Sequence, residues 1–151
     1  MADSPRVAMI DYGSGNLRSV EKALQHSGAE IFRAESPEAR GLAHWRGRVV
    51  KFPERPGLKV PHMGWNSLEL RAREPIFAGL SDPAFVYFVH SFYPEPAEAD
   101  LITAACTHGV PFAAGCRRGN VRGVQFHPEK SQTTGLRMLE NFVDELRGVT
   151  N

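Results

Sequence analysis

The sequence has few cysteines and no excess of charge of either sign. Its 151 residues include only Cys106 and Cys116, which are too few for a disulfide framework and lack the CxxC spacing of a zinc site. Eighteen Lys and Arg residues are balanced by 17 Asp and Glu residues, so we expect no broad basic surface for nucleic acid and no acidic tail. The six histidines are scattered and include no His-x3-His pair. We therefore expect no metal, no other cofactor and no nucleic-acid partner.

Long hydrophobic runs are also absent. No stretch approaches the roughly 18 apolar residues that a membrane-spanning helix needs, and the segment from Met1 to Arg6 has no apolar core of a secretion signal. These absences predict a cytoplasmic protein with no membrane partner. What remains is a globular composition, with 42% hydrophobic and 23% charged residues, over a length that suits a single domain spanning 1–151.

The first part of the chain predicts a strand–helix–strand unit. Arg6–Asp11 is a short apolar run, and it is followed by a glycine turn that ends at Asn16, a good N-cap for a helix. The predicted helix ends near Gly28, and Ala29–Phe32 predicts a second strand. Two strands joined by a helix normally lie parallel in one sheet with a right-handed crossover.

The second half of the chain predicts antiparallel hairpins. Its apolar segments, rich in aromatic and β-branched residues, are separated by short connections that suit tight turns. A final helix is expected to begin near Gln132 and to end at Gly148. Arg48–Phe52 predicts a further strand, whereas Pro61 and Gly64 mark loops. The expected strands of this half are Phe85–Tyr93, Leu101–Cys106, Pro111–Cys116 and Asn120–Phe126.

The most informative residue is His127, which lies where the last strand ends and the final helix is about to begin. Pro128 biases His127 towards an extended conformation, in which residues i and i+2 share a side. Glu129 can then hydrogen-bond one imidazole nitrogen and leave the other free as a base, which is two-thirds of a nucleophile–histidine–carboxylate triad. The alternative is a solvated histidine beside a carboxylate that favours the start of the helix.

Five segments of the chain occur in a recognisable order and together cover nearly its whole length. They are Ile10–Val20, Lys59–Asn66, Tyr87–Tyr93, Gly109–Ala114 and Gly123–Ser131. The last of them is similar to the His–Glu motif of the class I glutamine amidotransferases. Taken together, the five segments resemble the glutaminase subunits of imidazole glycerol phosphate synthase within that family.

The resemblance implies an α/β fold of the flavodoxin-like three-layer type and an enzyme that hydrolyses glutamine to glutamate and ammonia. It also implies a heterodimer in histidine biosynthesis, in which a cyclase partner, a (β/α)8 barrel, receives the ammonia. His127 matches the position of the catalytic base and Glu129 that of its orienting partner, while Ser91 and Phe92 match the positions that hold glutamine. The positions that match the interface with the cyclase are Asn16, His62, Met63, Trp65, Asn66 and Lys130.

The chain departs from the family between about residues 34 and 48. There the family carries several dozen more residues, including a glycine-rich oxyanion loop and a Gly-x-Cys-x-Gly elbow that bears the nucleophile. Cys116 lacks the flanking glycines of such an elbow, although nearby arginines could lower the pKa of its thiol. We therefore expect an internally truncated domain of marginal stability that is catalytically impaired or inactive. Two alternatives stay open: a non-catalytic scaffold that binds the cyclase, and a different cysteine hydrolase that uses Cys116.

Overall fold

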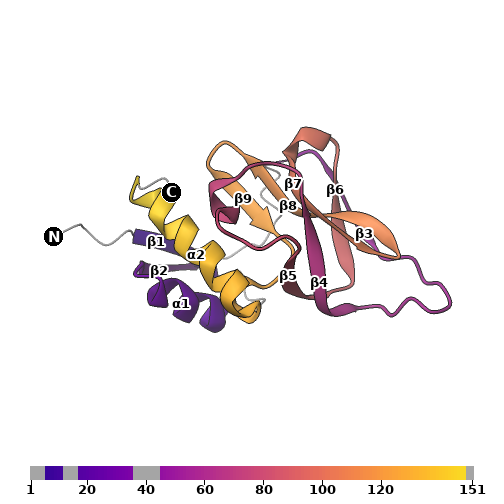
Figure 1. The fold of residues 1–151 in the computed structure, drawn as a ribbon, viewed down its shortest axis with the longest axis horizontal. Helices are drawn as coiled ribbons and strands as arrows, with labels where there is room; N and C mark the ends of the chain where they lie inside the picture. The colour runs from indigo at the N-terminus through magenta and orange to yellow at the C-terminus, as the bar shows by residue number, and fades with distance from the viewer. Residues whose placement is uncertain (1–5, 12–16, 36–44, 149–151) are drawn as a thin grey trace.

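The computed structural model describes residues 6–11, 17–35 and 45–148. It contains a small parallel α/β unit, an antiparallel β region and the C-terminal helix α2 (Gln132–Leu146), which lies between the two (Figure 1). Within these ranges, no helix is long and apolar enough to cross a membrane. The division into a parallel first part and an antiparallel second part agrees with the expectation from the sequence.

The parallel unit consists of β1 (Arg6–Asp11), α1 (Leu17–His26) and β2 (Glu30–Glu35). Strands β1 and β2 pair in parallel from Arg6 opposite Glu30 to Asp11 opposite Glu35, which confirms the predicted strand–helix–strand unit. Helix α1 ends at His26, and two residues later Gly28, with a positive φ of 86°, allows the chain to turn back into β2. The described parallel sheet therefore has two strands, fewer than a three-layer fold normally contains.

The antiparallel region is a five-stranded sheet in the order β5-β4-β7-β8-β9, with a separate two-stranded sheet beside it. The tight connections contain Gly109 and Gly119, both with positive φ, which confirms the predicted hairpins. The strands of the larger sheet are β4 (His62–Leu70), β5 (Ala84–His90), β7 (Ile102–His108), β8 (Val110–Arg118) and β9 (Val121–Val124). The smaller sheet pairs β3 (Gly47–Lys51) with β6 (Phe92–Pro96), and three 3-10 turns, η1 (Pro75–Phe77), η2 (Ala99–Leu101) and η3 (Pro128–Lys130), complete the region.

Two details of the predicted β region were wrong. The expected strand Phe85–Tyr93 is two strands, because the chain breaks at Ser91 and β6 leaves the large sheet to pair with β3. The expected loop around Pro61 and Gly64 is largely strand β4. Proline is tolerated at Pro61 because it precedes the first residue of the strand, and Gly64 joins the ladder opposite Phe88.

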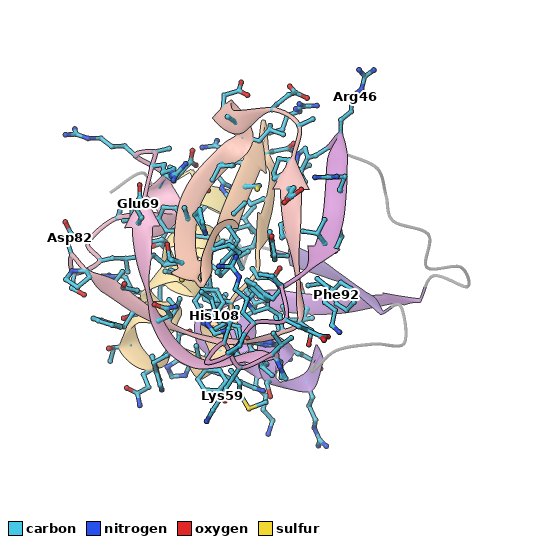
Figure 2. The ribbon with its side chains drawn as sticks, turned by 90° about the vertical axis from the view of Figure 1, so that its right-hand side faces the viewer. Arg46, Lys59, Glu69, Asp82, Phe92 and His108 are labelled. Carbon is cyan, nitrogen blue, oxygen red and sulfur yellow. The ribbon has the colours of Figure 1, made fainter. Side chains whose placement is uncertain are left out.

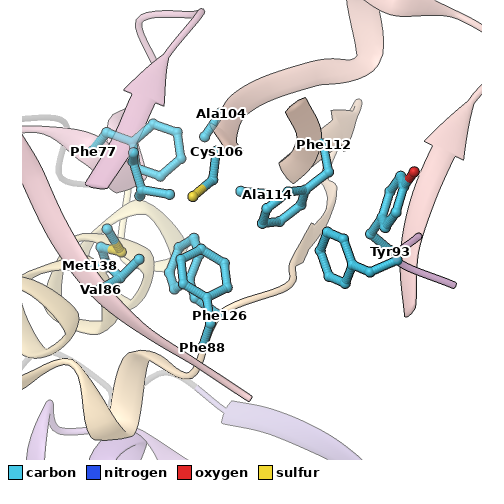
Figure 3. Close-up of a cluster of buried hydrophobic side chains, with 12 residues drawn as sticks. Phe77, Val86, Phe88, Tyr93, Ala104, Cys106, Phe112, Ala114, Phe126 and Met138 are labelled. Atoms are coloured by element: carbon cyan, nitrogen blue, oxygen red, sulfur yellow. The ribbon is translucent and has the colours of Figure 1, made fainter. Parts of the chain in front are cut away.

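The main hydrophobic core lies inside the antiparallel region (Figure 3). Its largest fully buried side chains include Phe52, Phe88 and Met138, so the loop after β3, the edge strand β5 and helix α2 all contribute to it. A second, smaller core joins α1 to α2 through Leu24 and Val143. Burial of each large apolar side chain contributes about 1.5–3 kcal/mol, so α2 stabilises the chain by serving both cores.

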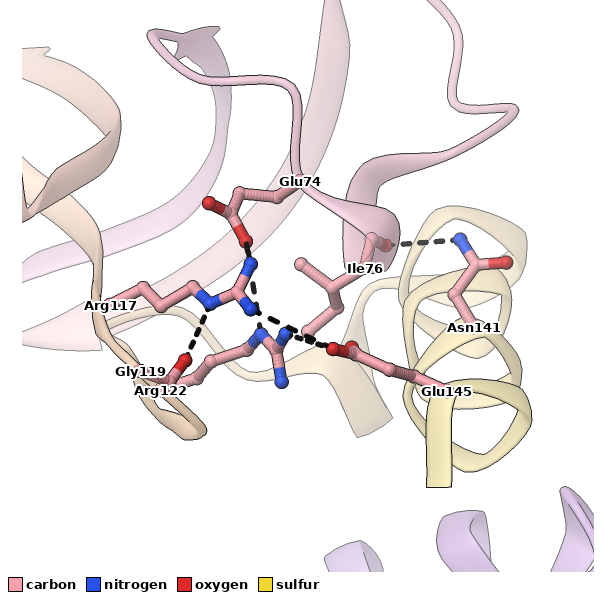
Figure 4. Close-up of polar contacts among 7 residues, drawn as sticks. All are labelled: Glu74, Ile76, Arg117, Gly119, Arg122, Asn141 and Glu145. Carbon is pink, nitrogen blue, oxygen red and sulfur yellow. Dashed lines mark hydrogen bonds and ion pairs between the residues drawn. The ribbon is translucent and has the colours of Figure 1, made fainter. Parts of the chain in front are cut away.

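Ion pairs hold the far end of helix α2 against the β region (Figure 4). Arg122 on β9 pairs with Glu145 on α2, and Arg117 on β8 pairs with Glu74 just before η1. Arg117 also lies 3.9 Å from Glu145, which links the two pairs into one network. These partly buried contacts fix the position of α2, and so of the segment that leads into it.

Candidate functional site

The predicted His–Glu pair is present and ordered. The Nδ1 atom of His127 lies 2.9 Å from Oε1 of Glu129. The Glu129 side chain is 2% exposed and that of His127 is 29% exposed, so the carboxylate is enclosed and the imidazole reaches solvent. Because a carboxylate only accepts, Nδ1 of His127 carries the proton and Nε2 is left with a lone pair. The enclosed carboxylate favours a histidine–carboxylate pair over the alternative of a solvated loop histidine.

Backbone hydrogen bonds hold His127 against strand β5. Its amide donates to the carbonyl of Tyr87 at 2.9 Å. The fully buried Ser131 then joins the two segments, since its hydroxyl donates to the His127 carbonyl at 2.7 Å and accepts from the Tyr87 amide at 2.9 Å. The imidazole is thus positioned by the sheet through three hydrogen bonds, and sequence reasoning did not identify Ser131.

Gly135 allows helix α2 to approach the His127 segment closely. A Cβ at this position would lie 1.8 Å from the carbonyl oxygen of Pro128, which is impossible without moving backbone. Any larger residue would therefore push the helix away from η3. The signal in the sequence was an isolated glycine inside a helical pattern. Such a glycine lowers helix stability, so its presence points to a packing requirement.

Neither cysteine is prepared to act as a nucleophile. Both Cys106 and Cys116 are buried free thiols. Burial raises the pKa of Cys106 to about 11 and also raises the pKa of Cys116. A catalytic cysteine needs the opposite shift, because the thiolate is the attacking species. This environment speaks against a hydrolase built on Cys116, and the nearby arginines do not offset the burial.

The two residues matched to glutamine binding lie at the break between β5 and β6. The carbonyl of Ser91 accepts a hydrogen bond from the Phe52 amide at 3.0 Å, and the carbonyl of Phe92 lies 2.8 Å from Nδ1 of His90. The Phe92 side chain is 53% exposed (Figure 2). The segment is therefore fixed through its backbone while the Phe92 side chain faces solvent.

The structure divides the residues matched to the cyclase interface into two groups. Met63 and Trp65 are two positions apart on β4, so they share its outer face, and they are 61% and 47% exposed. His62 and Asn66 lie on the other face, and His62 is buried. Lys130 is exposed in η3, one residue after Glu129. Asn16 lies outside the described residues.

Three histidines meet at the end of the large sheet. His62 lies opposite His90 across β4 and β5, and its ring stacks on that of His108 with centroids 4.1 Å apart. Burial, followed by the proximity of His108 and His90, lowers the pKa of His62 to about 4. Burial is also the main cause that lowers the pKa of His90. Among the residues that the structure describes, no group of three or more His, Cys, Asp or Glu side chains is arranged to hold a metal.

Comparison with known sequences identifies a family and several relatives that carry the same name. Residues 47–146 match the family described as glutamine amidotransferase class-I. The chain is 36% identical to "Imidazole glycerol phosphate synthase subunit HisH" of Methanosarcina acetivorans, over 92% of this chain and 98% of that protein. It is 46% identical to the HisH subunit of Syntrophotalea carbinolica over 78% of this chain and 61% of that protein.

The alignment with the Methanosarcina acetivorans protein is longer than the chain itself. It spans 200 positions, whereas the chain has 151 residues and aligns over 92% of them. The relative therefore has many residues without a counterpart here, even though almost its whole length is covered.

Solved structures share the fold at low sequence identity. The chain superposes on PurLQS from Thermotoga maritima with a TM-score of 0.73 at 12% identity, covering 95% of this chain and 100% of that chain. A Thermoplasma acidophilum protein described as part of a GMP synthase gives a TM-score of 0.71 at 17% identity, covering 97% of this chain and 95% of that chain. These likenesses support the expected α/β architecture.

Proposed function

The chain belongs to the class I glutamine amidotransferase family. We propose that it takes the place of the glutaminase subunit in an imidazole glycerol phosphate synthase, where it docks on the cyclase subunit but does not itself hydrolyse glutamine. The observation that carries this proposal is an intact His127–Glu129 pair in a chain whose only two thiols are buried and have raised pKa values. The relatives are named as subunits of that synthase, which supports the choice of partner.

The chemistry explains why the remaining pair is not enough. In an amidotransferase of this type a thiolate attacks the amide carbonyl of glutamine, and ammonia leaves from the tetrahedral intermediate. His127 can take the thiol proton at Nε2 and return it to the leaving nitrogen, with Glu129 stabilising the protonated ring. Without the thiol these steps have no starting point, and loss of the nucleophile alone costs on the order of 10⁶ in rate.

We attribute the missing thiol to an internal gap between about residues 34 and 48. The long alignment with the Methanosarcina acetivorans relative supports such a gap. The family match that begins at residue 47 and the two-stranded parallel sheet agree with a loss just before β3. The gap removes the oxyanion loop as well, which lowers transition-state stabilisation by about another 3–4 kcal/mol.

The docking surface in this proposal is the outer face of β4. Met63 and Trp65 present apolar side chains there, and aromatic residues and methionine are typical of the centres of protein interfaces. Lys130 and Asn16 belong to the proposed surface on the basis of the resemblance, and Ser91 with Phe92 forms the proposed glutamine segment. The domain as a whole, 1–151, is the unit that docks.

Gel filtration of the chain mixed with a purified cyclase subunit tests the docking. We expect a 1:1 complex that Trp65→Ala weakens and that Val49→Ala leaves unchanged, because Val49 is 72% exposed but lies on β3 in the other sheet. Failure of the unmodified chain to form any complex would refute the proposed docking.

Product assays of that mixture test the catalytic part of the proposal. We expect the cyclase to form product with ammonium salts and not with glutamine, and we expect no release of glutamate. Turnover of glutamine near about 1 s⁻¹, which lies within the ordinary range for enzymes, would show that the chain has a working nucleophile. Cys116→Ala is the matched variant, since any turnover that it leaves intact does not depend on Cys116.

A further inference from the structure

A continuous series of hydrogen bonds connects strand β4 through β5 to the first residue of β6. Nδ2 of Asn66 lies 3.3 Å from Nε2 of His62, and Nδ1 of His62 lies 3.0 Å from Nε2 of His90. Nδ1 of His90 in turn lies 2.8 Å from the carbonyl oxygen of Phe92. We call Asn66, His62, His90 and the Phe92 carbonyl the histidine relay.

Backbone groups at both ends determine the direction of the histidine relay. The Phe92 carbonyl can only accept, so Nδ1 of His90 carries a proton and Nε2 of the neutral ring accepts from Nδ1 of His62. At the other end, the amide orientation of Asn66 is set independently, because Nδ2 also donates to the Thr107 carbonyl at 2.9 Å and Oδ1 accepts from the Ser67 amide at 2.9 Å. Asn66 therefore donates to His62, and both rings carry their proton on Nδ1.

The surroundings of His62 favour neutral rings. His62 is 4% exposed and lies between the rings of Phe88 and His108, with centroid distances of 4.7 and 4.1 Å. A second proton on His62 would place an N–H against the amide N–H of Asn66, so a charged ring would lose a hydrogen bond as well as solvation. One arrangement of protons satisfies every polar atom of the relay.

We propose that His62 and His90 are positioning residues. They hold the Phe92 carbonyl through the histidine relay and so anchor the proposed glutamine-binding segment to strand β4. The identification of Ser91 and Phe92 as that segment rests on the proposed function. Strand β4 carries Met63 and Trp65 on its outer face and the relay on its inner face. The strand that we propose docks on the cyclase therefore also sets the backbone at the glutamine segment.

Nitrogen NMR of the unliganded full chain at neutral pH tests the histidine relay directly. Free neutral histidine prefers its proton on Nε2, whereas we expect the Nδ1–H form at both His62 and His90. His62→Phe keeps an aromatic ring in the stack but cannot donate to His90. We expect it to shift the Phe92 carbonyl carbon resonance, and we expect His62→Gln, whose amide both donates and accepts, to restore that resonance in part.

His108→Phe is the matched control, because His108 stacks on the same ring but belongs to no link of the histidine relay. We expect it to leave both tautomers and the Phe92 resonance unchanged. An Nε2–H form at either ring in the unmodified chain would overturn the proposal. Equal shifts of the Phe92 resonance in His62→Phe and His108→Phe would overturn it as well.

Titration with glutamine separates this inference from the proposed function. We expect glutamine to shift the Ser91 and Phe92 signals and to bind about tenfold more weakly to His62→Phe, which corresponds to the loss of one hydrogen bond. If the tautomers are as expected but glutamine shifts neither residue, the relay positions the Phe92 carbonyl and the proposed glutamine segment is wrong. If glutamine shifts both residues and binds equally well to His62→Phe, the segment is right and the positioning role is refuted.

Discussion

Acid should destabilise this protein through His62, and the size of the effect follows from its burial. The ring has an ordinary pKa of 6.5 in the unfolded chain, and burial beside His108 and His90 lowers the folded pKa to about 4. The unfolded state therefore binds a proton more readily than the folded state as the pH falls. The stabilising effect of the neutral ring is complete above about pH 6.5 and is lost progressively as the pH falls towards 4.

The expected loss can be calculated from these two values. Each pKa unit corresponds to about 1.4 kcal/mol, and at about pH 5 the unfolded ring is mostly protonated while the folded ring is mostly neutral. The free energy of unfolding should then be about 2 kcal/mol lower than at about pH 7.5 from His62 alone. That is a large fraction of the total of about 5–15 kcal/mol that is typical of a domain.

Urea unfolding at about pH 7.5 and about pH 5 measures this effect. His62→Phe retains the stack on Phe88 and cannot be protonated, so its loss of stability between the two pH values should be about 2 kcal/mol smaller than that of the unmodified chain. His26→Gln is the control, because His26 is exposed on α1 and should leave the pH dependence as it is. The same loss in all three proteins would refute the reasoning.

Three further predictions concern packing and the thiols. Gly135→Ala should lower the free energy of unfolding by at least about 3 kcal/mol in a urea titration, because the added Cβ would lie 1.8 Å from a backbone oxygen. Gly119 has a positive φ but open space around it, so the control variant Gly119→Ala should lower the free energy of unfolding by only about 1 kcal/mol. Ser131→Ala should cost about 1–3 kcal/mol, since it leaves a buried amide without its acceptor, and Ser81→Ala at an exposed site should change the thermal midpoint little. Cys116 should react with iodoacetamide at mildly alkaline pH only after unfolding, because burial raises its pKa, and rapid labelling of the native chain would contradict this.

The local patterns of the sequence predicted the His127–Glu129 pair well. Proline between the two residues and a following helix restrict the backbone, so a separation of two positions is enough to bring the side chains together, as the 2.9 Å contact shows. The hairpins around Gly109 and Gly119 followed in the same way from turn residues within short connections. These features depend on neighbours along the chain.

The break at Ser91 and the strand around Gly64 could not be predicted in this way. Phe85–Tyr93 contains no glycine or proline that would mark a break, and its division between two sheets depends on β3, which lies about forty residues earlier in the chain. Gly64 is a loop residue by local rules, but it pairs with Phe88 because β5 supplies a partner for β4 from His62 to Leu68. Cross-strand pairing between distant segments decided both outcomes.

The sequence by itself determined the family, the antiparallel second half, the closing helix and the presence of a histidine–carboxylate pair without a suitably flanked cysteine. Each of these is written in residue types and short spacings. Only the tertiary structure decided that His62 meets His90, that Ser131 ties His127 to β5, and that both thiols are buried with raised pKa values. Those properties arise from contacts between segments far apart in the chain. Burial and the direction of these hydrogen bonds are defined only in the folded state.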